Sequence, residues 1–111
     1  MMKLIQNKQG DIHIFKVVGR LDSMTAPQFD EVLMQIIGSG GSKLVIDCED
    51  LEYISSAGLR VLNKATKRLQ PEAGKIVLCL MVDYIREVFE IAGFDTFLPI
   101  VGTLDDALGA F

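Results

Sequence analysis

The chain has 111 residues, half of them hydrophobic, and its 15 acidic residues against 11 Lys and Arg give a net charge of −4. This length suits one domain, so we expect residues 1–111 to form a single folded unit. The negative charge argues against general nucleic-acid binding, which relies on a cationic surface. No apolar run reaches the roughly 20 residues of a membrane-spanning helix, and polar residues from Gln6 to Lys8 interrupt the start before a signal-peptide core could form. We therefore expect a free-standing cytoplasmic protein that binds neither nucleic acid nor a membrane.

The amino-terminal part predicts a hairpin followed by a helix. Apolar residues at Leu4-Ile5 and over 12–18 flank a polar, glycine-containing turn over 7–11, which is typical of two antiparallel strands. Thr25 or Ser23 can cap the helix that follows. The glycine-rich segment 38–41 ends that helix. Within it the apolar residues recur at helical spacing, at Phe29, Val32, Leu33, Ile36 and Ile37.

The remaining chain alternates apolar strands with amphipathic helices. Residues 43–48 read as a buried strand, and the stretch 51–62 leads into a helix from about Ala57 to Gln70. A further strand is predicted over 75–81 and an edge strand over 97–101. The other predicted features are a helix capped by Asp83 and ended by Gly93, and a terminal helix capped by Thr103.

These elements predict an α/β fold in the order β-β-α-β-α-β-α-β-α, with one mixed, mostly parallel sheet covered by helices. In such sheets the functional loops lie beyond the carboxyl ends of the strands. The loop at Asp22 and the loop at Ser55-Ser56 both follow strand ends, so we expect them to share one rim.

The start of the helix at Ser55-Ser56 combines two hydroxyls with Gly58. The first amides of a helix have no intrahelical partners and carry the positive end of its dipole, so a Ser oxygen fits as a cap and a phosphate is favoured there. On spacing alone, Ser55 and Ser56 are interpreted first as caps, with Gly58 allowing close packing. Further along, this helix carries a basic stripe, Arg60, Lys64, Lys67 and Arg68, which is either a solvated face or a surface for an acidic partner.

Several spaced motifs resemble the STAS domain of anti-sigma factor antagonists. They span nearly the whole chain and occur in the family's order: 19–22 with Thr25-Ala26, 44–47, 53–59, 74–78 and 88–94. The resemblance implies a small non-enzymatic domain without cofactor that binds a serine-kinase anti-sigma factor and thereby frees a sigma factor. Phosphorylation of one serine ends the binding, and a serine phosphatase restores it.

The family pattern, laid on this chain, implies Ser56 as the phosphoacceptor, with Ser55 as the second choice. Ala57, Gly58 and Leu59 match the pattern, whereas Ser55 stands where the family has Asp. The partner-binding residues expected from the shared rim are Asp22, Ser55, Ser56, Gly58 and Arg60.

Other functions stay open as alternatives. A constitutive STAS adaptor that binds a phosphatase, a cyclase or a sensory complex without a serine switch is favoured by Ser55 in the Asp position. An enzyme with Ser56 as nucleophile needs a base, and the only histidine, His13, belongs to a distant strand and is expected to be structural. Cys48 and Cys79 lack metal or redox spacing and are expected in the core, with reactive thiols as the lesser alternative. No catalytic or metal-binding residue is assigned, and a weak homodimer is left open.

Overall fold

Strands and helices alternate along the computed structural model, which describes all 111 residues. The strands are β1 (Met2–Gln9), β2 (Ile12–Leu21), β3 (Lys43–Asp47), β4 (Leu51–Ile54), β5 (Lys75–Cys79) and β6 (Ile100–Val101). The helices are α1 (Ala26–Gly38), α2 (Ser56–Leu69), α3 (Asp83–Ile91) and α4 (Leu104–Leu108), with short 3-10 turns at Gln70–Glu72 and Phe94–Thr96. The predicted α/β fold is confirmed.

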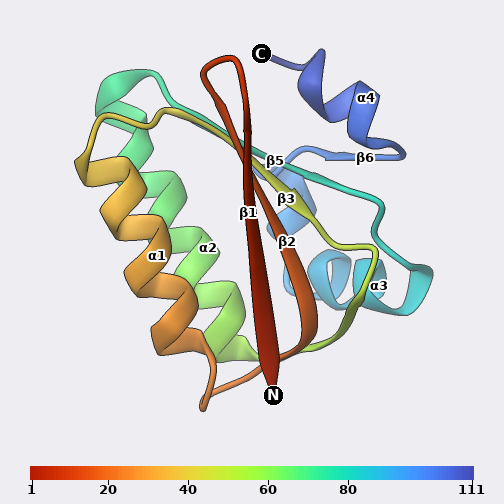
Figure 1. Cartoon of the computed structure of the whole chain (residues 1–111). Helices are drawn as coiled ribbons and strands as arrows, with labels where there is room; N and C mark the ends of the chain where they lie inside the picture. Colours follow the sequence, from red (N-terminus) through yellow and green to blue (C-terminus); the bar gives the residue numbers. More distant parts are fainter.

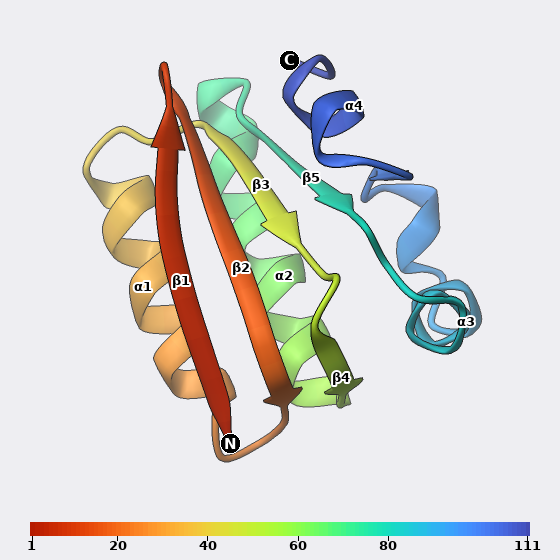
Figure 2. The ribbon, with the colours of Figure 1, turned by 45° about the vertical axis from the view of Figure 1, so that its right-hand side comes forward.

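One sheet holds the six strands in the order β1-β2-β3-β5-β6, with β4 beside β2 (Figures 1 and 2). β1 runs antiparallel to β2, and all other pairs are parallel. The mixed, mostly parallel sheet expected from the alternation of strands and helices is therefore present. β6 lies at one edge of the sheet, the position that Pro99 predicted for the strand over 97–101.

The predicted order has five strands, because it treated residues 51–54 as the approach to the following helix. In the structure these residues form a sixth strand, β4. β2 has ten residues, enough to pair with β3 along Ile12–Lys16 and with β4 along Gly19–Leu21. The register shifts between Gly19 and Arg20, and the amide of Gly19 donates to the carbonyl of Asp50 (3.0 Å). Gly19 has φ +97°, and a side chain there would collide with the carbonyl of Met1, so only glycine fits this bulge.

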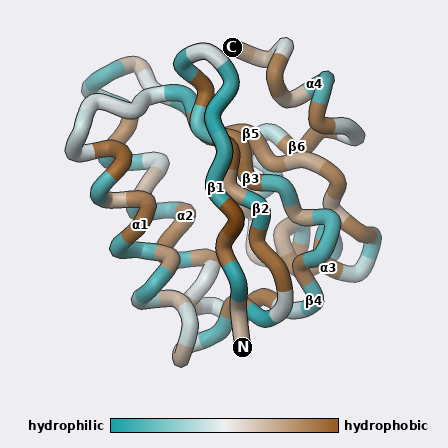
Figure 3. Tube along the Cα trace, in the orientation of Figure 1, coloured by the Kyte–Doolittle hydropathy of each residue, from teal (hydrophilic) through white to brown (hydrophobic).

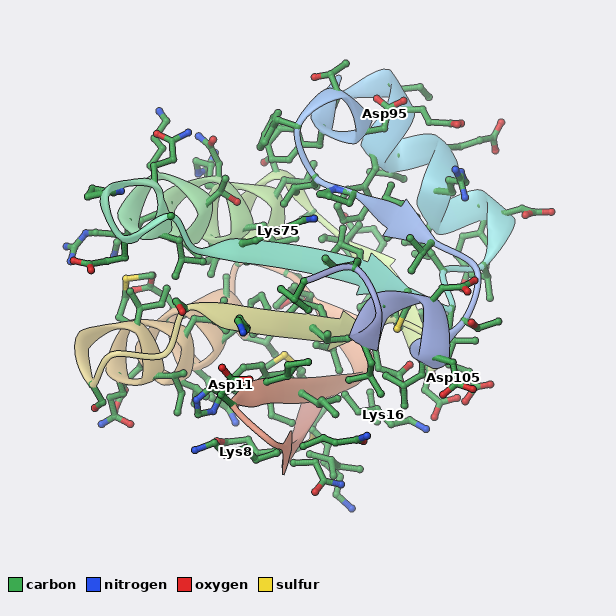
Figure 4. All side chains as sticks on the ribbon, turned by 90° about the horizontal axis from the view of Figure 1, so that it is seen from above. Lys8, Asp11, Lys16, Lys75, Asp95 and Asp105 are labelled. Atoms are coloured by element: carbon green, nitrogen blue, oxygen red, sulfur yellow. The ribbon has the colours of Figure 1, made fainter.

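The helices cover the two faces of the sheet unequally. Alternate residues of the central strands point to opposite faces: Leu44 and Ile46 join the large core with α1, α2 and α3, whereas Val45 joins a small core under α4. Figure 3 shows hydrophobic residues along these strands and mixed hydropathy along α1 and α2, as expected of helices with one buried side. In Figure 4, Lys8 in β1 and Asp95 in the 3-10 turn after α3 lie on opposite sides of the molecule.

Two local predictions after β5 were wrong. Asp83 is the first residue of α3 rather than its cap, which is Val82 in an extended conformation. The last strand begins only at Ile100, because Phe94–Thr96 form a 3-10 turn and the aromatic rings of Phe94 and Phe97 pack together, with centroids 5.1 Å apart. Gly93 follows α3 with φ +77°, as predicted for a helix-ending glycine. No helix has the length and hydropathy required to cross a bilayer.

Candidate functional site

The carboxyl ends of β2 and β4 lie side by side. Leu21 pairs with Ile54 in the parallel register, and the amide of Ser55 donates to the carbonyl of Leu21 (2.9 Å). The chain leaves β2 into α1 and leaves β4 into α2, so both helices begin at this end of the sheet (Figure 2). The prediction that the Asp22 and Ser55-Ser56 loops share one rim is confirmed.

Asp22 organises the loop between β2 and α1. Its Oδ1 accepts hydrogen bonds from the amides of Met24 (3.0 Å) and Thr25 (3.2 Å), and its own amide donates to the hydroxyl of Thr25 (2.9 Å). Partial burial acts to raise the pKa of Asp22, but these hydrogen bonds to the carboxylate outweigh it and hold the pKa below its usual value. The second oxygen, Oδ2, lies 3.7 Å from the Nε of Arg20.

Ser55 occupies the N-cap position of α2, but its side chain makes no capping hydrogen bond. Its Oγ is the one buried side-chain N or O atom of the chain that lacks a hydrogen-bond partner. The prediction that this hydroxyl caps the helix was therefore wrong. A buried and unpartnered hydroxyl is also poorly placed as a phosphoacceptor, because a kinase must reach the oxygen.

Ser56 is the first residue of α2 and is exposed to solvent. The amide of Leu59 makes the first backbone bond of the helix, to the carbonyl of Ser55 (3.1 Å), so the amides before it have no intrahelical partner. A phosphate on Ser56 would lie in the favourable field of these amides. Of the two adjacent hydroxyls, the exposed one belongs to Ser56.

Gly58 is buried where α2 crosses the ends of β2 and β4. A Cβ at this position would lie 2.8 Å from Cγ of Leu21 and 2.9 Å from Cγ1 of Ile54. The absence of a side chain therefore lets the helix approach the sheet. Gly58 is the one predicted partner-binding residue that is buried. It can therefore influence a partner only indirectly, by setting the position of α2 against the sheet.

Arg60 lies on the exposed side of α2, at a groove of about 440 Å³ between α1 and α2. Ser23, Pro27 and Asp30 of the α1 side face Arg60 and Lys64 across this groove. Lys64 bonds to Asp30 at 3.0 Å and links the two helices. Lys64 is thus the one member of the basic stripe that forms an ion pair. Arg60 is the member of the stripe that is nearest to Ser56 along α2.

The structure adds residues that sequence reasoning missed. The guanidinium of Arg20 lies 4.2 Å from the ring centroid of Tyr53, because these two residues are paired across β2 and β4. Met24 at the loop tip is 86% exposed, and Tyr84 at the start of α3 donates to the carbonyl of Glu52 (2.9 Å). With β4 unrecognised, no sequence signal placed Arg20 beside Tyr53. These residues extend the shared rim of the two loops. From here on, the rim means the surface formed by Arg20, Asp22, Met24, Tyr53, Ser56 and Tyr84.

His13 lies far from the rim. It is the second residue of β2, whereas Leu21 ends that strand, and eight residues of strand span about 26 Å at 3.3 Å each. Burial lowers the pKa of His13, which is consistent with the expected structural imidazole. The distance rules out His13 as a base for Ser56. No group of three or more His, Cys, Asp or Glu side chains is arranged to hold a metal ion.

Comparisons with known proteins bear on the whole chain. A family model of the STAS domain matches residues 3–107. BtrV, a candidate anti-sigma factor antagonist of Bordetella bronchiseptica, is 37% identical over 110 residues, which cover 99% of this chain and 95% of that protein. An anti-sigma-B factor antagonist of Listeria monocytogenes is 35% identical over 89 residues, or 80% of this chain and 77% of the relative. The crystal structure of an anti-sigma factor antagonist from Mycobacterium paratuberculosis has a TM-score of 0.90 at 26% identity, covering 99% and 93% of the two chains. The family match includes both loops of the rim.

Proposed function

Because the chain belongs to the STAS family of anti-sigma factor antagonists, we propose that it binds an anti-sigma factor with serine-kinase activity and releases the sigma factor that this kinase holds. Antagonists of this family are regulators and not enzymes. The partners in this proposal are the kinase and a serine phosphatase, and the setting is the cytoplasm. The observation that carries the proposal is the exposed hydroxyl of Ser56 at the rim, next to the buried hydroxyl of Ser55.

The rim has the composition of a protein-binding surface. Tyr and Arg dominate the energetically important residues of interfaces, and here Arg20 stacks on Tyr53 while Tyr53 stays 40% exposed. Met24 and Tyr84 add exposed apolar area on either side. Asp22 holds the loop that presents Met24, so we assign it both an organising role and, through Oδ2, a contact with the partner.

Phosphorylation of Ser56 acts on this surface directly. The kinase transfers the γ-phosphoryl group of ATP to Oγ of Ser56, which releases ADP and the hydroxyl proton. The phosphate adds roughly −1.5 to −2 charges at neutral pH. The first turn of α2 accommodates such an anion, so the fold is retained while a tightly packed or acidic partner surface is repelled. The phosphatase reverses the change by hydrolysing the phosphate ester.

The site assignment is tested by mapping the phosphate. The cognate kinase is isolated by affinity capture on the chain and incubated with ATP and the wild-type, Ser56→Ala and Ser55→Ala proteins. Intact-mass and tandem mass spectrometry should show one phosphate on the wild type and on Ser55→Ala, located at Ser56, and none on Ser56→Ala. Phosphorylation of Ser56→Ala to the wild-type extent would overturn the assignment.

A second candidate function follows from Ser55, which replaces the family's Asp and leaves its hydroxyl without a partner. In that case the chain is a constitutive adaptor for a phosphatase, a cyclase or a sensory complex. Equal recovery of every captured partner by the wild type and by Ser56→Asp would favour the adaptor over the switch.

A further inference from the structure

Arg60 is an exposed cation for which the structure shows no ion pair. The six ion pairs of the protein involve Lys16, Arg20, Lys43, Lys64 and Arg86 as cations. Arg60 lines the groove between α1 and α2 and also a neighbouring polar groove of about 480 Å³ along α2. Its charge is therefore available to an anion.

The spacing on α2 brings Arg60 to Ser56. Residues four apart on a helix lie on the same side, with Cβ atoms about 5–6 Å apart. Helical side chains also incline toward the amino end of the helix, so a side chain as long as that of Arg60 can reach the turn that begins at Ser56. Both residues are exposed to solvent.

The other cations near Ser56 are less suited to it. Lys64 lies two turns further on, about 12 Å along the helix axis, and it bonds to both carboxylate oxygens of Asp30 (3.0 and 3.2 Å). Arg20 lies on the rim, but its guanidinium stacks on Tyr53 and faces Asp22. Of these three cations, Arg60 is the one that can pair with a group on Ser56 without leaving an existing partner.

We propose that Arg60 binds the phosphate of phosphorylated Ser56 within the same chain, with guanidinium N–H groups donating to the phosphate oxygens. This inference rests on the proposed phosphorylation of Ser56 and assigns Arg60 a role in its outcome. The planar guanidinium matches two phosphate oxygens at once, and the phosphate carries nearly two charges where a carboxylate carries one. The pairing changes two surfaces together: Ser56 gains an anion, and the groove between α1 and α2 loses its free arginine.

The test measures the phosphate itself and needs no kinase. Phosphoserine is inserted at position 56 during translation, in the wild-type background and in Arg60→Gln, Arg60→Lys and Arg68→Gln, and the phosphate is titrated by ³¹P NMR. A phosphoserine normally titrates near pH 6. A paired arginine favours the dianion, so we expect the phosphate pKa to be lower in the wild type than in Arg60→Gln by at least half a unit, about a threefold change in proton affinity.

The control is Arg68→Gln, which removes the same side chain from the same helix two turns beyond Arg60 and should titrate like the wild type. The phosphate pKa in Arg60→Lys should fall between those of the wild type and Arg60→Gln. The lysine ammonium keeps the positive charge but cannot bind two phosphate oxygens with one planar group. Identical phosphate pKa values in the wild type and Arg60→Gln would overturn the pairing. An equal upward shift in Arg60→Gln and Arg68→Gln would also overturn it, because it would show a diffuse field rather than a contact. Neither outcome bears on whether a kinase modifies Ser56, so the proposed function is tested separately.

Discussion

The carbonyl of Leu21 accepts a hydrogen bond from the amide of Ser55 at 2.9 Å. This bond ties the last residue of β2 to the residue that precedes α2, and it holds the Asp22 loop against the start of the helix that carries Ser56. The two loops are therefore close enough for one partner surface to contact both.

The close approach of α2 to the sheet depends on Gly58. Gly58→Ala should destabilise the fold by about 1–3 kcal/mol in urea unfolding, because the new methyl group overpacks against Leu21 and Ile54. The matched control is Gly38→Ala at the end of α1, where an added Cβ meets nothing within 4 Å. That variant should be neutral or gain up to about 1 kcal/mol from helix propensity. Equal stability of Gly58→Ala and the wild type would contradict the packing role.

The hydroxyl of Ser55 should contribute nothing to the stability of α2. Ser55→Ala removes a buried oxygen that has no hydrogen-bond partner, so the free energy of unfolding should stay within about 0.5 kcal/mol of the wild type or rise. Thr103→Ala provides the contrast, because the Thr103 hydroxyl accepts from the amide of Asp106 (3.0 Å) and its loss should cost about 1 kcal/mol. A loss from Ser55→Ala as large as that from Thr103→Ala would show that Ser55 caps the helix in solution.

Much of the fold could be predicted from local pattern. The period of the apolar residues identified α1 and α2, and the glycine-rich segment marked the end of α1, because these signals depend on neighbours in the chain. β4 could not be found in this way. Its four residues gain their strand partner from the second half of β2, a tertiary contact that no local pattern records.

The candidate site was predicted in position but not in detail. Placing Asp22 and Ser56 on one rim followed from the rule for strand ends. The inward turn of the Ser55 hydroxyl and the stacking of Arg20 on Tyr53 depend on how α2 and β4 pack against β2. These features are set by three-dimensional contacts and were visible only in the structure.

The Asp22 carboxylate should make the stability of the protein depend on pH. Its pKa is lower in the folded than in the unfolded chain, so its contribution is present above about pH 4, the ordinary value, and is lost as the pH falls through the folded pKa. In Asp22→Asn the Oδ1 acceptor remains but does not titrate. The fall in Tm between pH 6 and pH 3 should therefore be smaller in Asp22→Asn than in the wild type. An identical fall in the two proteins would contradict the assignment of the lowered pKa to Asp22.

The two cysteines should be inert in the folded protein. Burial raises the pKa of Cys48 far above its usual range and that of Cys79 to about 11, and both side chains are inaccessible to solvent. A thiol with that pKa is only about 0.1% ionised at pH 8. A maleimide should label neither thiol within minutes at pH 8 and both in urea. Rapid labelling of one cysteine without denaturant would show that its strand end opens.

The switch at Ser56 is tested most directly by calorimetric titration of the captured anti-sigma kinase with two forms of the chain, unmodified and fully phosphorylated at Ser56. The phosphorylated form should bind at least tenfold more weakly, a loss of about 1.4 kcal/mol or more, while its circular-dichroism spectrum stays unchanged. Equal dissociation constants for the two forms would contradict control of binding through Ser56.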